Sequence, residues 1–124
     1  MKRILTILLL IISFGVNAQS VTLSVDTLFN GVWDLQGKTL NINGKISGNV
    51  IIKNAIIEAN RYAQIFDTNV ALENCKTDNF SVAWYGAKPT NTDNSEAFQK
   101  SSDMCIKNNI YNLFIPEGAY TISN

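Results

Sequence analysis

Short segments in which apolar and polar residues alternate fill residues 21–82. One segment surrounds Leu40 and Ile42, and compact apolar runs follow at residues 50–52 and 55–57. A period of two residues and an excess of β-branched side chains are typical of β-strands. Gly and Asn separate the segments, as expected of turns, because both residues tolerate positive φ angles. This pattern by itself predicts antiparallel hairpins.

A repeat of 20 residues changes that prediction. Residues 49–55 (NVIIKNA) align with residues 69–75 (NVALENC), so that Asn, Val, a large aliphatic residue, Asn and a small residue recur in matching positions. A repeat of this length that contains strands but no helix is typical of a β-solenoid, in which coils stack on one another. Asn54 would then lie over Asn74 in a ladder of side-chain amides. The alternative is a chance likeness between two strand-turn segments.

The pattern changes after residue 80, and a helix is expected over about residues 94–107. Asp93 is the expected N-cap of this helix, with Glu96 three residues later as its capping-box partner. After the helix, residues 113–115 are expected to form a buried strand, and Pro116 begins a turn. The expected buried face of the helix comprises Ala97, Phe98, Ser101, Cys105 and Ile106.

The first 20 residues have the three parts of a secretory signal peptide. Lys2 and Arg3 give a positive start, and the apolar stretch at residues 4–16 is shorter than the roughly 20 residues needed to span a membrane. We expect cleavage near Ala18 and Gln19 and an exported product that is secreted, periplasmic or located at the cell surface. A buried N-terminal helix is the alternative.

Charge and composition narrow the classes of partner. The chain has 10 basic and 10 acidic residues, so removal of Lys2 and Arg3 with the signal leaves 8 basic and 10 acidic residues. This balance, without clustered Lys and Arg, argues against binding of nucleic acid or of a membrane surface after cleavage. The absence of His argues against zinc and copper sites. Cys75 and Cys105 are permitted to form a disulfide after export, but two small buried residues are the favoured interpretation.

The second half of the chain resembles the start of the pectate-lyase-like right-handed β-helix superfamily, specifically the rhamnogalacturonase/epimerase-like pectate lyase domain. The resemblance covers residues 80–124, including the expected helix. The loop at residues 89–94 departs from the family pattern, because it lacks the usual Gly and acidic residues, and an ion-binding role for it is therefore in doubt. The matching positions are Tyr85, Gly86, Ala87 and Lys88 in the opening motif, Asp93 in the loop, and Pro116, Gly118 and Tyr120 in the strand-closing motif.

Together the repeat and the resemblance imply an all-β fold, a right-handed single-stranded parallel β-helix with one capping α-helix. The expected organisation is a signal peptide at residues 1–19, N-terminal solenoid coils at 20–79 and the start of the pectate-lyase-like domain at 80–124. On this interpretation the sequence is the N-terminal part of a longer β-helix.

The resemblance also implies a function. Enzymes of this family act on acidic polysaccharides such as pectins, hydrolases with clustered Asp and lyases commonly with Ca²⁺ and an Arg or Lys base. These groups typically lie on coils after the opening motif. We therefore expect the N-terminal portion of a secreted polysaccharide lyase or glycoside hydrolase, without its active site, and with Ca²⁺ only in a full-length lyase. The alternative is a non-catalytic β-solenoid module for glycan binding or adhesion.

Two acidic pairs share the repeat spacing of 20 residues, Glu58 with Asp78 and Glu73 with Asp93. Stacked coils lie about 4.8 Å apart, near the roughly 5 to 9.5 Å between the carboxylates of glycoside hydrolases. Only Glu58 and Asp78 stay in register with the repeat, yet two solvated turn carboxylates are the favoured interpretation. The remaining candidates are Arg61 as a lyase base and Trp33, Trp84, Tyr85 and Tyr62 as sugar-stacking aromatics, for which a place in the core is favoured.

Overall fold

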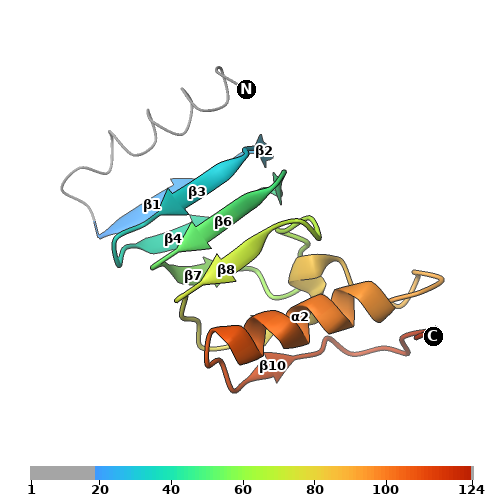
Figure 1. Cartoon of the computed structure of the whole chain (residues 1–124). Coiled ribbons are helices and arrows are strands. Elements are labelled where there is room, and N and C mark those ends of the chain that lie inside the picture. The colour runs from blue at the N-terminus through green and yellow to red at the C-terminus, as the bar shows by residue number, and fades with distance from the viewer. Residues whose placement is uncertain (1–18, 124) are drawn as a thin grey trace.

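The computed structural model describes residues 19–123, and their regular structure consists mostly of short strands (Figure 1). No strand in this range exceeds four residues. None of its helices is long and apolar enough to cross a membrane. In chain order the elements are β1 (Ser20–Leu23), β2 (Thr27–Leu28), β3 (Gly31–Asp34), β4 (Thr39–Ile42), β5 (Ile46–Ser47), β6 (Val50–Lys53), β7 (Ile56–Ala59), β8 (Ala71–Glu73), β9 (Phe80–Ser81), the 3₁₀-helix η1 (Val82–Tyr85), α2 (Ser95–Lys107) and β10 (Leu113–Phe114).

All strand pairs among these elements are parallel, so the antiparallel hairpins that alternation alone predicted are wrong. The sheets have the orders β1-β4-β7, β2-β5 and β3-β6-β8, and β9 pairs with β10. The chain visits the first three sheets in the same order each time and so forms layers (Figure 1). The first layer is β1 to β3, the second is β4 to β6, and the third is β7, the bridge residue Phe66 and β8.

Apolar side chains stack from layer to layer in the interior. Val21 pairs with Leu40, and Leu40 with Ile57, and none of the three is more than 4% exposed. Ile52 lies over Leu72 in the neighbouring sheet, as the repeat predicted, and both are fully buried. Burial of one such side chain contributes roughly 1.5–3 kcal/mol, so these ladders are the main attraction between layers.

A polar ladder runs along the turn that follows β3, β6 and β8. Nδ2 of Asn74 donates to Oδ1 of Asn54 at 2.7 Å, and Nδ2 of Asn54 donates to Oδ1 of Asp34 at 3.0 Å. Asn54 and Asn74 have φ angles of 56° and 53°. Asn is one of the few residues that tolerate this left-handed conformation. The two Asn residues therefore shape the turn and link the layers at the same time.

Helix α2 lies along the free edge of β8 (Figure 1). Sδ of Met104 accepts a hydrogen bond from the Leu72 N–H at 3.3 Å. Asn108 donates through Nδ2 to the Leu72 carbonyl at 3.1 Å and accepts through Oδ1 from the Cys75 N–H at 2.9 Å. Each of these main-chain groups would cost about 1–3 kcal/mol if it were buried without a partner. Side chains of the helix region thus replace a further strand at this edge.

The helix starts one residue later than predicted, and its N-cap is Asn94 rather than Asp93. The Asn94 side chain links the preceding loop to the segment after β10, because Oδ1 accepts from the Lys88 N–H at 2.9 Å and Nδ2 donates to the Thr121 carbonyl at 3.3 Å. Asp93 still accepts a hydrogen bond from the N–H of Ser95, at 2.9 Å. Asp93 thus provides the predicted hydrogen-bond acceptor near the start of the helix, although it lies one residue before the N-cap.

The buried face of α2 differs from the prediction at two positions, because Phe98 is only half-buried and Ile106 is exposed. Ala97, Ser101 and Cys105 are buried as expected, but Ile106 is 74% exposed and Met104 is buried instead. The reason is that β8 contacts the helix on the side of Met104, where the thioether meets the sheet edge. At about 100° per residue Met104 lies close to the face of Ala97, whereas Ile106 lies roughly half a turn away, so the helical period itself favours Met104.

The strand expected at residues 113–115 is shorter and less buried than predicted. Only Leu113 and Phe114 form β10, and Leu113 and Ile115 are 37% and 49% exposed. Within the described residues β10 pairs with β9 alone. One edge of β10 is therefore unpaired within the described residues, and the Leu113 side chain is partly open to solvent.

Replacement of Asn54 tests the polar ladder. Asn54→Ala should lower the free energy of unfolding by about 2 kcal/mol, because it removes two side-chain hydrogen bonds and places Ala at a positive φ angle. Asn54→Gly should have a smaller effect, because Gly keeps the backbone conformation. Urea denaturation followed by circular dichroism measures both. Equal stability of Asn54→Ala and the parent protein would show that the ladder contributes nothing.

Candidate functional site

A cleft of about 570 Å³ opens on one flank of the molecule, between β7 and residues 76–79. At one end, the Lys76 N–H donates to the Ala55 carbonyl at 2.9 Å and Lys76 bridges Ile56. At the other end, Oγ of Ser81 donates to the Arg61 carbonyl at 2.5 Å. Between these anchors, residues 77–79 make no ladder hydrogen bonds with β7. The cleft is therefore a gap in otherwise regular strand pairing.

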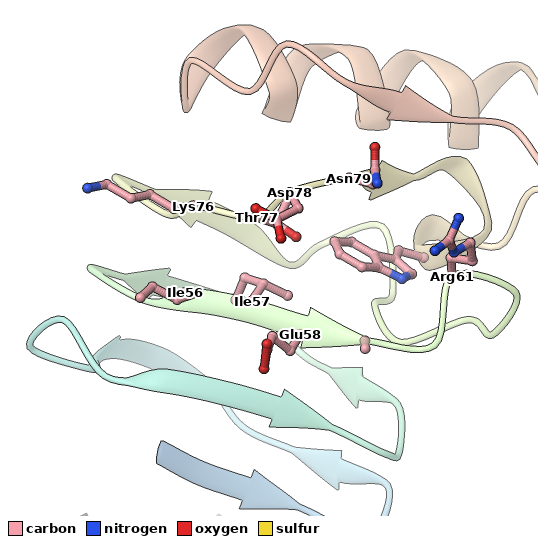
Figure 2. A pocket seen from close by; sticks show the side chains of 10 residues that line it. Ile56, Ile57, Glu58, Arg61, Lys76, Thr77, Asp78 and Asn79 are labelled. Atoms are coloured by element: carbon pink, nitrogen blue, oxygen red, sulfur yellow. The ribbon is translucent and has the colours of Figure 1, made fainter. Parts of the chain in front are cut away.

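Charged side chains stand at both ends and on both walls of the cleft. Figure 2 shows Lys76 at one end and Arg61 at the other, with Glu58 on β7 and Asp78 on the facing segment. The indole of Trp84 forms part of the inner wall and is only 1% exposed. The residues that line the cleft are Ile56, Ile57, Glu58, Ala59, Arg61, Lys76, Thr77, Asp78, Asn79 and Trp84.

The register that the repeat predicted brings Glu58 and Asp78 to the same cleft. In Figure 2, however, the Glu58 side chain points away from Thr77 and Asp78. Both carboxylates are on exposed residues. The Asp78 main-chain carbonyl accepts a hydrogen bond from Nδ2 of Asn112 at 3.3 Å, which ties this segment to the chain that enters β10. With the Glu58 carboxylate turned away from Asp78, the two solvated groups do not form an acid–base pair across a bound sugar.

A small cluster of exposed groups borders the cleft at Arg61. The guanidinium carbon lies 4.9 Å from the ring centroid of Phe114, close enough for a cation–π contact. The Tyr62 ring packs edge-on against the same Phe114 at 5.6 Å and is 68% exposed. Oδ1 of Asn60 accepts from the Tyr62 N–H at 2.8 Å, which shapes the turn that presents both side chains. The cluster thus combines a held cation with an exposed aromatic ring.

Of the four aromatic residues considered for sugar stacking, three are buried and one is exposed. Trp33, Trp84 and Tyr85 are 6% exposed or less and belong to the core, which was the favoured interpretation. Nε1 of Trp84 donates to the Asn60 carbonyl at 3.1 Å. Tyr62 is the exception, because the core interpretation is wrong for it. The contribution of Phe114 was missed, since its contact with Arg61 joins residues that are distant in the sequence.

The opening motif at residues 85–88 has structural roles. The Tyr85 hydroxyl donates to the Val70 carbonyl at 2.6 Å, and burial raises the pKa of this phenol. Gly86 ends η1 with a φ of 96°, a conformation that favours Gly. Ala87 is buried, whereas Lys88 is exposed and uses its main-chain N–H to bind Asn94. The motif thus ties η1 to β8 and to the loop before α2.

The strand-closing motif is structural as well. The Tyr120 hydroxyl donates to the Pro116 carbonyl at 2.8 Å, and its ring packs against Phe98 of α2 with centroids 5.5 Å apart. Gly118 has a φ of 142°, and a Cβ on this residue would lie 2.5 Å from Cγ of Pro89. The turn is therefore packed closely against the loop that precedes the helix.

The second acidic pair is not brought together. Glu73 forms ion pairs with Lys53 at 3.9 Å and with Lys107 at 4.0 Å. Asp93 instead binds the main-chain N–H groups of Ser95 and Ser123. No group of three or more His, Cys, Asp or Glu side chains in the described range could hold a metal ion.

Most of the isolated aspartates act as local hydrogen-bond acceptors. Asp26 accepts from the Lys45 N–H and Asp103 from the Gln99 side-chain amide, both at 2.8 Å. The Asn54 amide, followed by the Gln36 N–H, lowers the pKa of Asp34. Hydrogen bonds from Ser95, and then from Ser123, lower the pKa of Asp93. The carboxylates of Asp26, Asp34 and Asp93 thus stabilise turns, and that of Asp103 binds within helix α2.

The chain matches no protein-family profile, no curated protein and no solved structure. The resemblance to pectate-lyase-like proteins therefore depends on the motif residues alone. Membership of that family stays a prediction, and the chemistry of the cleft has to be argued from its own side chains.

The lowered pKa values of Asp34 and Asp93 predict an acid-labile fold. Both fall below the ordinary value of 3.8. Their stabilisation is therefore complete above that value and is lost as the pH falls below it, when the folded carboxylates take up protons. The double variant Asp34→Asn/Asp93→Asn should lose less stability than the parent between about pH 5 and pH 2. Urea unfolding across this range measures the difference, and parallel curves would contradict the expectation.

The burial of both cysteines predicts that their thiols react slowly with thiol reagents in the folded protein. Cys75 and Cys105 are buried free thiols, and burial raises the pKa of both, to about 11 for Cys105. Little thiolate is therefore present at neutral pH, and the reagent has little access. Both thiols should react with an aromatic disulfide reagent only after unfolding in urea. Rapid reaction of the folded protein, or no free thiol after unfolding, would contradict the structure.

Proposed function

We propose that the described chain is a right-handed, single-stranded parallel β-helix that α2 caps along one edge. The proposal is supported by parallel partners 17 to 20 residues apart, as in Thr39 with Ile56 and Ile51 with Ala71. The repeated visit to three sheets and the Asn54–Asn74 ladder support it further. Right-handedness follows from the strong preference of parallel crossover connections for that hand.

We further propose that the flank cleft binds an acidic polysaccharide of the pectin or rhamnogalacturonan type, as part of a secreted carbohydrate-active protein. The observation that carries this proposal is the pairing of a held cation, Arg61, which lines the cleft, with the exposed ring of its neighbour Tyr62. A guanidinium binds a carboxylate through two parallel hydrogen bonds. An aromatic ring offers an apolar face to the C–H groups of a sugar. The cluster thus suits a uronic acid residue.

The rest of the cleft suits a chain of such sugars. Lys76 stands at the end opposite Arg61, so two cations are available to successive acidic units. Thr77 and Asn79 offer polar side chains to hydroxyl groups along the wall. Asp78 accepts hydrogen bonds from hydroxyls, while Glu58 points away from that wall and leaves it less negative.

Binding is favoured over catalysis for this segment. Lyase or hydrolase activity is the second candidate, because the motif residues resemble such enzymes and because Glu58 and Asp78 line one cleft. The Glu58 carboxylate is turned away from Asp78, however, and the Arg61 guanidinium packs on Phe114 instead of standing free as a base. In this proposal Ca²⁺ belongs to a full-length lyase and takes no part in binding here.

Calorimetric titration of the purified protein with an oligogalacturonate, in the presence of a chelator, tests the binding proposal. Arg61→Ala should weaken binding by about ten-fold or more, because it removes charge-assisted hydrogen bonds. Tyr62→Ala should weaken it by a smaller factor. Lys88→Ala is the matched control, because Lys88 is an exposed cation that does not line the cleft.

Two results would overturn this proposal. One is the absence of binding, and the other is an affinity for a neutral oligosaccharide of the same length equal to that for the acidic one. The same samples are assayed for new reducing ends and for the absorbance of an unsaturated uronate. Either product would favour the enzymatic alternative, especially if Asp78→Asn abolished it.

A further inference from the structure

Two turns of the molecule contain Asn followed by Gly, at Asn30-Gly31 and Asn43-Gly44. In such a pair the Gly nitrogen can attack the Asn side-chain carbonyl, because Gly has no Cβ to hinder the approach. Asn is for this reason among the thermolabile residues. Whether the reaction occurs in a folded protein depends on how freely the attacking nitrogen and the side-chain amide can meet. The two turns differ in this respect.

The reacting groups of the first pair are held by the next layer. Oδ1 of Asn30 accepts a hydrogen bond from the Asn49 N–H at 2.8 Å. The Gly31 N–H, which would become the attacking nitrogen, donates to the Asn49 carbonyl at 3.0 Å. Attack would require both hydrogen bonds to break. The first Asn-Gly pair is thus protected by the strand pairing itself.

The second pair has its reacting groups free. Asn43 is exposed, and within residues 19–123 neither its side-chain amide nor the Gly44 N–H makes a hydrogen bond. The main chain on both sides is held, because the Asn43 N–H donates to the Leu23 carbonyl and the Lys45 N–H to Asp26, each at 2.8 Å.

Gly44 is itself required by the fold. A Cβ at this position would lie 2.5 Å from both the carbonyl carbon and the carbonyl oxygen of Val25. Backbone atoms of the layer above cannot move away as a flexible side chain can. The close stacking of layers therefore keeps a Gly next to Asn43, and with it an unhindered nitrogen.

We propose that Asn43 is a site of spontaneous deamidation in the folded protein, whereas Asn30 is not. The Gly44 nitrogen bonds to Cγ of Asn43, the Cγ–Nδ2 bond breaks, and Nδ2 leaves as ammonia with the proton from the Gly44 nitrogen. Water then opens the cyclic imide at one of its two C–N bonds. The products are aspartate, with the original main chain, and isoaspartate, with the chain routed through the former side chain.

The modification changes a second hollow of the surface. Asn43 borders a cavity of about 270 Å³ that Asp26 and Lys45 also line. The product adds a carboxylate to the cavity that Asp26 and Lys45 line. Isoaspartate also lengthens the turn between β4 and β5 by one main-chain atom. The hydrogen bonds of Lys45 with Asp26 and with Thr27 lie in that turn and would be weakened.

Peptide mapping after incubation of the purified protein at mildly alkaline pH and body temperature tests the proposal. Trypsin releases residues 39–45 separately from the peptide that contains Asn30, because Lys38 and Lys45 bound the first of these. Asn43 should acquire the mass of an acid at roughly ten times the rate of Asn30 or faster, since Asn30 must first lose two hydrogen bonds. Labelling by an isoaspartate-specific methyltransferase should grow in parallel.

The same protein incubated in urea provides the reference, because both pairs should then react at similar rates. Asn43→Gln is the variant control, and its 39–45 peptide should stay unmodified, since a Gln side chain would have to close a larger and less favoured ring. The proposal is overturned if Asn30 reacts as fast as Asn43 in the folded protein. It is also overturned if Asn43 stays intact over a period in which the urea-unfolded chain is modified.

Discussion

Main-chain pairing between successive layers is the constraint on which this molecule depends. Each short strand satisfies the edge of the strand before it and exposes a new edge in turn. At β8 this series ends, because Met104 and Asn108 supply an acceptor, a donor and a second acceptor to Leu72 and Cys75. The helix is marginal by its own sequence, and its place is set by the edge that it covers.

The candidate site lies where main-chain pairing between successive layers is interrupted. Residues 77–79 leave β7 between two anchors, and the space between them becomes the flank cleft. A regular ladder there would have left no room for a ligand. Arg61 and Tyr62 stand where the chain turns away from β7, so the irregular segment also carries the side chains best suited to recognition.

The sequence predicted the features that repeat and missed those that depend on single long-range contacts. The spacing of Asn54 and Asn74 anticipated their hydrogen bond, because a ladder needs only equal offsets. The burial of Met104 rather than Ile106 was missed, although at about 100° per residue Met104 lies close to the face of Ala97 and Ile106 lies roughly half a turn away from it. The direction of the Glu58 side chain, away from Asp78, could not be predicted, because register fixes which residues are neighbours but not where their side chains point.

The connection after β7 has a different length from its counterpart one layer earlier. Six residues, 60–65, lead from β7 to the bridge residue Phe66, where three, 43–45, lead from β4 to β5. The turn between β6 and β7 (residues 54–55) is shorter than the turn between β3 and β4 (residues 35–38), which offsets most of the extra length. Phe66 therefore still forms its bridge with Ile46. A loop of this kind can change in length at little entropic cost. The segment that carries Arg61 and Tyr62 can therefore change in length while the layers beneath it stay unchanged.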